Sequence, residues 1–311
     1  MDGSEAGETG VEVWRGGVAA WECDVMSHLN VRFYLAKTLE GLASFAAELG
    51  LPRVFIPGQS PTTLVIRQTY VRFLREARVN AQLAMTGAVL AMGEADARLL
   101  MTIRHADGAP AAAFTLSVDH VSMADRAPTP WPDRVRERAA RVTVEAPVYA
   151  RPRTLNLDPI VPAVTGDRAR AMGLTPIGFT ALGPGDCDAF GYMRFDSFLG
   201  RIGDGIPRLG VKPHDAPERD GRMGGAAVEY RLVMFETPRL GDRIELRSCL
   251  AEAAPRYRRF VHWLLDPDTG KPWGVAANVG VSFDLVTRKL TELSGEDLAA
   301  HQSLVVPGFV I

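Results

Sequence analysis

The chain has 311 residues, of which 47% are hydrophobic and 23% are charged, and its formal net charge at pH 7 is −2. This composition is typical of one or two well-packed globular domains, and the small net charge excludes a general attraction to nucleic acid or to an anionic membrane surface. Three cysteines without paired spacing exclude a disulfide framework and a zinc site of the Cys-pair type.

The first ten residues, MDGSEAGETG, are acidic and poor in apolar side chains. They fit neither a signal peptide nor a membrane anchor, so we interpret residues 1–10 as a disordered tail. No segment reaches the ~18 consecutive apolar residues that a membrane-spanning helix needs. We therefore expect a cytoplasmic protein with no membrane partner.

The segment WECDVMSHLNVRFY, residues 21–34, places Asp24, His28 and Asn30 directly before an apolar run. In that run, apolar residues recur at alternating steps of four and three, which predicts one buried face of a helix over residues 35–49. Gly50 and Pro52 give the stop signal. Strand-like runs follow at residues 64–73, 82–90, 98–105 and 111–121, so an N-terminal domain over 11–125 is predicted to be one helix with an antiparallel sheet.

Residues 126–174 are rich in proline and arginine and contain one short charged helical segment, which predicts a connector packed on the surface. The segment GDCDAFGYMRFDSF then opens a second domain, predicted over 175–290. Its helix contains Gly200, Gly203, Gly205 and Pro207. Each interior glycine costs about 1 kcal/mol relative to alanine, so a shortened or kinked helix is expected. Strands are predicted at 226–235, 243–251, 257–266 and 273–283, with a C-terminal extension over 291–311.

The two predicted domains repeat one another in sequence. A single shift along the chain carries Asp24 to Asp188, and the same shift relates two pairs in the helices: Tyr34 with Phe198, and Glu40 with Asp204. Slightly smaller shifts relate three pairs downstream: Tyr70 with Tyr230, Glu76 with Glu236, and Gly108 with Gly270. Small differences in loop length between the two copies explain why the shift becomes smaller. Because the landmarks keep one order, we infer a duplicated domain.

A helix wrapped by an antiparallel sheet, present twice, resembles the hotdog fold, an α+β class. The segment ECDVMSHLNVRFYLAKTLEG is similar to the D-x-x-G-H-x-N entry segment of the 4-hydroxybenzoyl-CoA thioesterase-like family, and GDCDAFGYMRFDSF is similar to another form of the same segment. Tandem versions also occur among plant-type acyl-ACP thioesterases, whose D-x-N-x-H-x-N segment is similar to residues 24–30. The resemblance implies a double hotdog with acyl-CoA thioesterase activity.

The resemblance also implies the site residues. Asp24 and Asp188 match the catalytic carboxylate, His28 is a hydrogen-bonding partner for the thioester carbonyl or the water, and Asn30 is an N-cap. Ser27, Gly191, Tyr192 and Asn30 are expected at the substrate. The copies depart from the family pattern at three positions: Ser27 replaces glycine, Tyr192 replaces histidine and Arg194 replaces asparagine. The sequence therefore leaves open whether both sites or only one of them is catalytically active.

Thioester hydrolysis needs a group that polarises the carbonyl and a nucleophile or a base. Backbone N–H groups at a helix N-terminus can hold an oxyanion, and in hotdog pairs the carboxylate of one copy faces such donors of the other. An aspartate there acts as nucleophile or as base for water, and the sequence leaves both open. Also open are the acyl group, CoA or acyl carrier protein as its carrier, and the oligomeric state, from monomer to homo-oligomer. No cofactor is expected beyond coenzyme A within the substrate.

Structural roles compete with the catalytic ones. An aspartate before a helix is commonly a cap or turn residue, and His28 can simply satisfy a backbone carbonyl. Cys23 and Cys187 are expected to be small buried residues rather than nucleophiles, and Glu40 is expected to be solvated or ion-paired. Two other functions remain open on the same fold: a hydratase or dehydratase, which spaces its aspartate and histidine differently, and a non-catalytic protein that binds acyl thioesters.

Overall fold

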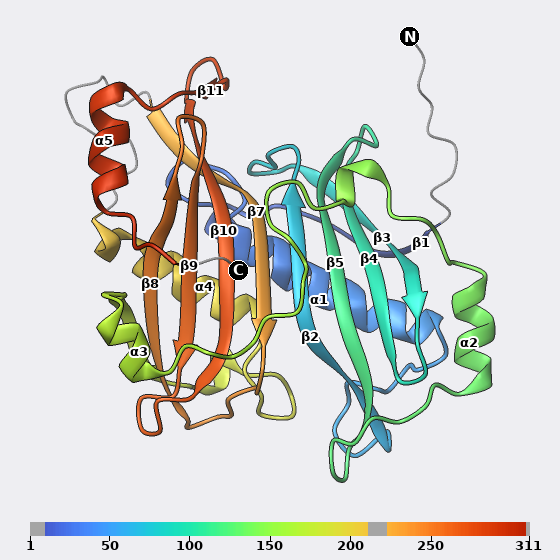
Figure 1. Ribbon diagram of the computed structural model, residues 1–311. Helices are drawn as coiled ribbons and strands as arrows, with labels where there is room; N and C mark the ends of the chain where they lie inside the picture. The colour runs from blue at the N-terminus through green and yellow to red at the C-terminus, as the bar shows by residue number, and fades with distance from the viewer. Residues whose placement is uncertain (1–9, 211–222, 309–311) are drawn as a thin grey trace. The chain divides into compact units, whose positions relative to one another are not determined.

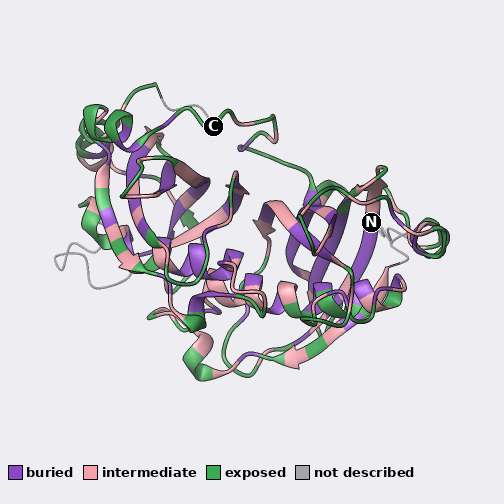
Figure 2. Ribbon diagram, turned by 90° about the horizontal axis from the view of Figure 1, so that it is seen from below, coloured by how far each residue is buried: buried purple, intermediate pink, exposed green. Residues whose placement is uncertain are grey.

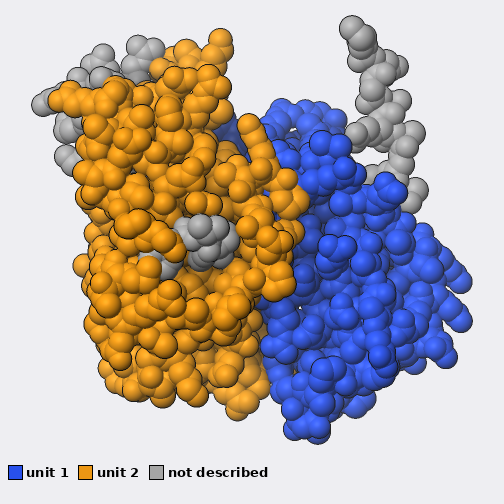
Figure 3. Space-filling view, in the orientation of Figure 1, with its two compact units in different colours: residues 1–151 blue, residues 152–311 orange. Residues whose placement is uncertain are grey.

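In the computed structural model, residues 10–210 and 223–308 are described, and the chain divides between residues 151 and 152 into two units (Figure 3). The division lies within the predicted connector 126–174. Apart from Gly10, the predicted N-terminal tail lies outside the described residues, as do residues 309–311 of the predicted C-terminal extension. Figure 2 shows that the buried residues of each unit concentrate on its strands.

The first unit is one antiparallel sheet with a long helix, α1, on one face (Figure 1). The order of its strands is β1-β3-β4-β5-β2. The elements are β1 (Val11–Gly17), α1 (Val31–Glu48), β2 (Thr62–Phe73), β3 (Gln82–Met92), β4 (Asp96–His105), β5 (Pro110–Ser122) and α2 (Asp133–Ala140). Helix α1 packs closely on the sheet at Gly41, where a Cβ atom would lie 2.5 Å from the Met85 sulfur. A larger residue here would force the Met85 side chain to move.

The second unit repeats this plan with strand order β7-β10-β9-β8-β6. Its elements are α3 (Gly166–Ala171), β6 (Thr175–Ala181), α4 (Phe195–Gly205), β7 (Met223–Met234), β8 (Arg243–Ala253), β9 (Arg258–Leu265), β10 (Pro272–Asp284), β11 (Leu290–Thr291) and α5 (Gly295–Ser303). Helix α4 gives way to a 3-10 turn at residues 206–209, so the predicted interruption by Gly205 and Pro207 is confirmed. The predicted strands are confirmed, whereas β1, β6, β11 and α5 had not been predicted, and the connector contains two helices, α2 and α3, where one had been predicted.

The duplication extends to the irregularities of the strands. Four β-bulges recur at equivalent positions in the two units, and each adds one residue to its strand: Val13 and Ile177, Arg67 and Val228, Leu90 and Ala251, and Ala111 and Trp273. Bulges re-aim the side chains around them and are inherited with the fold. Their coincidence in four strand pairs confirms that the two units are copies of one domain.

The predicted pairing of Tyr70 with Tyr230 and of Glu76 with Glu236 is wrong by one residue. The structure aligns β2 with β7 through the bulges at Arg67 and Val228, and this alignment differs by one position from the one based on sequence. Tyr70 therefore corresponds to Arg231, and Glu76 to Thr237. The error arose because both strands carry a tyrosine within the same window. The consequence is large, since a slip of one residue assigns every side chain to the opposite face of the sheet.

A chain of buried polar side chains crosses the second sheet. His262 of β9 is completely buried, and its Nδ1 lies 2.7 Å from Ser248 Oγ while its Nε2 lies 2.8 Å from Asn278 Oδ1. By the strand registers, Ser248 corresponds to Gly87 of the first unit, His262 to Met101 and Asn278 to Leu116. The second unit has thus exchanged an apolar layer for a hydrogen-bonded one.

This buried histidine makes stability depend on pH. Burial lowers the pKa of His262 to about 4, below the value of about 6.5 expected in the unfolded chain. The unfolded state therefore binds a proton first, and stability that is fully present above pH 6.5 is lost as the pH falls toward 4, by up to about 3 kcal/mol. Urea unfolding followed by circular dichroism at pH 7, 6 and 5 measures this loss.

The control carries the residues of the first unit at the same three positions: Ser248→Gly, His262→Met and Asn278→Leu. We expect its unfolding free energy to fall less between pH 7 and pH 5 than that of the natural chain. Equal pH dependence in the two proteins would show that His262 is not the titrating group.

Candidate active site

The loop before α1 folds around one carboxylate. Oδ1 of Asp24 accepts hydrogen bonds from the backbone N–H groups of Met26, at 2.9 Å, and of His28, at 3.1 Å. The loop closes because Cys23 pairs with Leu29, and Ser27 takes a left-handed conformation with φ of 62°. Asparagine, aspartate and glycine adopt that conformation most readily. This explains why the related family pattern has glycine where this chain has Ser27.

The loop before α4 repeats the same geometry. Oδ1 of Asp188 accepts the N–H groups of Phe190 and Tyr192, both at 2.9 Å, and Gly191 has φ of 80°. In both loops, two N–H donors hold one carboxylate oxygen. For the other oxygen, Oδ2, the described part of the chain provides no hydrogen bond. Asp24 is half-buried and Asp188 is exposed, so each carboxylate keeps one oxygen for another molecule.

A second carboxylate fixes each loop to its helix. Lys37 of α1 lies 2.6 Å from Glu22, and in the second unit Arg201 of α4 lies 2.8 Å from Asp186. The shift along the chain that relates Asp24 to Asp188 relates these two pairs as well. The ammonium of Lys37 is also largely buried, which makes the pair more effective than a surface ion pair. Sequence reasoning missed this support, although the same shift would have revealed it.

His28 forms an acid–base pair with a residue that sequence reasoning had not connected to it. Its Nε2 lies 2.7 Å from a carboxylate oxygen of Glu76, and the backbone at His28 bridges to Arg78 in the segment after β2. Arg78 also approaches Glu76, at 3.4 Å. Glu76 lies far from His28 along the chain, and only the folding of β2 beside the loop brings the two together. A carboxylate in this position orients an imidazole ring through the hydrogen bond that it accepts.

The second loop lacks this pair. Tyr192 occupies the position of His28, and its hydroxyl accepts a hydrogen bond of 2.7 Å from Arg239, whose guanidinium lies 4.8 Å from the centre of the tyrosine ring. Thr237 occupies the position of Glu76. Asp188 therefore matches Asp24 in geometry, but the residues that the structure describes give it no acid–base partner of the kind found beside Asp24. The predicted divergence of the two sites is chemical rather than geometrical.

The starts of the two helices also differ. Asn30 is the N-cap of α1, as predicted, and its side-chain oxygen accepts the N–H of Arg32 at 2.9 Å. Arg194 begins α4 without a side-chain cap and instead pairs with the buried carboxylate of Asp196, at 2.7 Å. Replacing an asparagine cap by alanine typically costs about 1 kcal/mol. The role of Asn30 in holding the geometry is thus confirmed, and contact of Asn30, Ser27, Gly191 or Tyr192 with a substrate stays a prediction.

The remaining candidates have structural partners. Burial raises the pKa of the Cys23 and Cys187 thiols, which disfavours the thiolate form that a nucleophile needs. Glu40 accepts a 2.8 Å hydrogen bond from the Trp14 indole. Among residues 10–210 and 223–308, no cluster of three His, Cys, Asp or Glu side chains is arranged to hold a metal ion, and no helix is long and apolar enough to cross a membrane.

Comparisons with known proteins agree with this geometry. The family model described as the Thioesterase-like superfamily matches the chain twice, over residues 18–139 and 182–301. Each match contains one aspartate loop and the helix that follows it. Among curated proteins, none matches the sequence significantly.

Three solved structures share the double fold. One from Lactobacillus plantarum, assigned as an oleoyl thioesterase, is 12% identical and has a TM-score of 0.66, with 88% of this chain and 96% of that chain covered. The 12:0-ACP thioesterase from Umbellularia californica is 11% identical, with a TM-score of 0.64 and coverage of 86% and 92%. An acyl-ACP thioesterase from Bacteroides thetaiotaomicron is 12% identical, with a TM-score of 0.60 and coverage of 86% and 96%. The predicted pair of hotdog domains is confirmed.

Proposed function

Because the chain belongs to the thioesterase-like superfamily, we propose that it hydrolyses an acyl-CoA or acyl-ACP thioester, with Asp24 as the reacting carboxylate. The observation that carries this proposal is the His28–Glu76 pair beside Asp24, whereas beside Asp188 the described residues place Tyr192 and Thr237 at the equivalent positions. A site that handles protons needs such a group within reach of the substrate. The second loop keeps the fold of the first without its acid–base chemistry.

In the proposed reaction, Oδ2 of Asp24 takes a proton from a water molecule, and the oxygen of that water attacks the acyl carbon. The two N–H groups on Oδ1 hold the carboxylate in place during this step. The carbon–sulfur bond then breaks, and the proton held by Asp24 passes to the leaving thiolate. His28, oriented by Glu76, binds the water or the thioester carbonyl. Backbone N–H groups at a helix N-terminus stabilise the oxyanion.

A substrate panel tests the proposal. Acyl-CoA esters of increasing chain length, and the same acyl groups on acyl carrier protein, are incubated with the protein, and free thiol is measured. We expect thiol release that saturates with substrate. Binding without release would favour a non-catalytic acyl-thioester protein, and hydration of enoyl-CoA without thiol release would favour a hydratase. Either outcome would overturn the hydrolase assignment.

Replacing Glu76 by glutamine tests the acid–base pair. The glutamine side chain can still accept a hydrogen bond from His28, so the ring keeps its orientation while the negative charge is lost. We expect kcat to fall by about a hundredfold, within the range for acid–base groups, and the acidic limb of the kcat–pH profile to move. The matched control is Glu236→Gln, the residue that sequence alone had paired with Glu76, and we expect no change in its pH profile.

A further inference from the structure

A segment of the connector crosses the second sheet on the face opposite to α4 (Figure 1). Residues 154–164, here named the strap, are held at one end by two buried charges of β7. The carboxylate of Glu229 accepts the N–H groups of residues 154 and 155 at 3.0–3.1 Å. The guanidinium of Arg231 donates to the carbonyl oxygens of Asn156, at 3.0 Å, and Asp158, at 2.5 Å.

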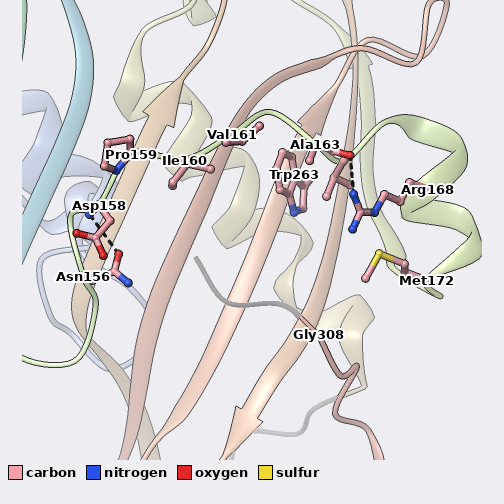
Figure 4. Close-up of a pocket in the computed structure, with 11 residues that line it drawn as sticks. Asn156, Asp158, Pro159, Ile160, Val161, Ala163, Arg168, Met172, Trp263 and Gly308 are labelled. Atoms are coloured by element: carbon pink, nitrogen blue, oxygen red, sulfur yellow. Dashed lines mark hydrogen bonds between the residues drawn. The ribbon is translucent and has the colours of Figure 1, made fainter.

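Beyond Asp158 the strap arches over a cavity of about 330 Å³. Figure 4 shows Trp263 of β9 beneath the strap, Arg168 of α3 and the following residue Met172 on one side, and Asn156 and Asp158 on the other. Pro159 and Pro162 have no N–H groups with which to anchor the strap to the sheet here. The volume lies at the lower end of the range typical of sites for small ligands.

The floor of the cavity carries a polar group with no partner. Trp263 is only 2% exposed, and its indole N–H makes no hydrogen bond within the described part of the chain. A buried donor left unpaired typically costs 1–3 kcal/mol, so nearly all such groups in proteins meet a partner, water included. In the first unit the corresponding residue is Thr102. The indole is therefore specific to the second unit.

The lining determines which molecule fits. The indole N–H requires a hydrogen-bond acceptor, and Arg168 adds a positive charge at one end of the cavity, where it donates to the carbonyl of Ala163 at 3.1 Å. Ile160, Val161 and Met172 line the cavity with apolar surface. The carboxylate of Asp158, on the opposite side, repels an anion there and so directs a negative group toward Arg168. A small molecule that combines a negatively charged hydrogen-bond acceptor with a short apolar chain meets these conditions.

We propose that this cavity binds a monocarboxylate with an apolar tail, such as a short or medium-chain fatty acid, with its carboxylate between Trp263 and Arg168. A fatty acid is also the product class of the proposed thioesterase reaction, so the cavity is a second, non-catalytic place for the product. The assignment rests on the cavity itself and not on that reaction. It therefore stands or falls independently of the proposed function.

The experiment follows the indole N–H signals of the ¹⁵N-labelled protein by NMR while sodium octanoate is added. The sequence has five tryptophans, and the signal absent from Trp263→Phe identifies Trp263. We expect octanoate to shift that signal to saturation, and octanol to shift it at least tenfold less effectively. No shift at 10 mM octanoate would overturn the proposal and would leave an ordered water as the partner of the indole. Equal effects of octanol and octanoate would also overturn it.

Two variants of α3 locate the charge. Arg168→Gln removes the guanidinium at the cavity, whereas Arg170→Gln changes a neighbouring exposed arginine that pairs with Asp167. We expect Arg168→Gln to weaken octanoate binding at Trp263 at least tenfold and Arg170→Gln to leave it unchanged, with thioester hydrolysis the same in both. Equal binding by the two variants would contradict the site. If no thioester is hydrolysed but the Trp263 signal still shifts, only the proposed function fails.

Discussion

Replacing Asp24 by asparagine is expected to lower kcat for thioester hydrolysis by about a thousandfold, within the range observed for loss of a catalytic base. Asparagine keeps an oxygen at the position of Oδ1, so the hydrogen bonds from Met26 and His28 can remain and the loop keeps its shape. What is lost is the ability of the second oxygen to accept a proton. Thiol release under saturating substrate measures kcat, and circular dichroism confirms that the fold is unchanged.

The matched control is Asp188→Asn, because Asp188 has the same two N–H contacts in the second loop. We expect its kcat to change less than threefold, since Tyr192 and Thr237 stand where the first loop has His28 and Glu76. A large loss of activity with Asp188→Asn and none with Asp24→Asn would move the reaction to the second loop. No loss with either variant would refute the proposed role of the carboxylates altogether.

The local features of this fold could be predicted because each is written in a short segment. Helix α1 follows from apolar spacing, the interruption of α4 from Gly205 and Pro207, and the two aspartate loops from their common pattern. The cap at Asn30 belongs to the same class, since it depends only on residues within one turn. Landmarks that recur in the same order in both copies then sufficed to infer the duplication.

Features that depend on pairing between strands could not be predicted in the same way. Both strands carry a tyrosine within the same window, so the alignment of β2 with β7 that was based on sequence slipped by one residue. That slip concealed the fact that Glu76 has no acidic counterpart in the second copy. The partner of His28 was missed for a related reason, because the contact arises from a backbone bridge at Arg78 and not from proximity along the chain.

The strap shows the same limit over a longer distance. Glu229 and Arg231 are almost fully buried, at 1% and 2% exposure, although they belong to a strand whose sequence suggests alternating exposure. Their partners lie much earlier in the chain, in a connector that looks like surface. Buried charges are tolerated when they are well hydrogen-bonded, and here the peptide groups of the strap serve that purpose. The strap thus satisfies two buried charges of the second unit, although only Leu155 and Val164 of its own residues are buried.

Replacing Arg231 by methionine is therefore expected to lower the free energy of unfolding by about 3 kcal/mol, because Arg231 donates to two carbonyl oxygens of the strap and a hydrogen bond to a charged group typically contributes about 1.5–3 kcal/mol. The change removes charge-assisted hydrogen bonds to the strap and leaves Glu229 buried without the cation two residues away on the same strand. Arg72→Met is the control, because Arg72 also donates to connector carbonyls, at 3.2–3.3 Å, but is only half-buried. We expect it to cost less than about 1 kcal/mol. Urea unfolding of both variants, with proteolysis of the strap as a local readout, makes the comparison, and equal losses would show that burial of Arg231 contributes nothing to its effect.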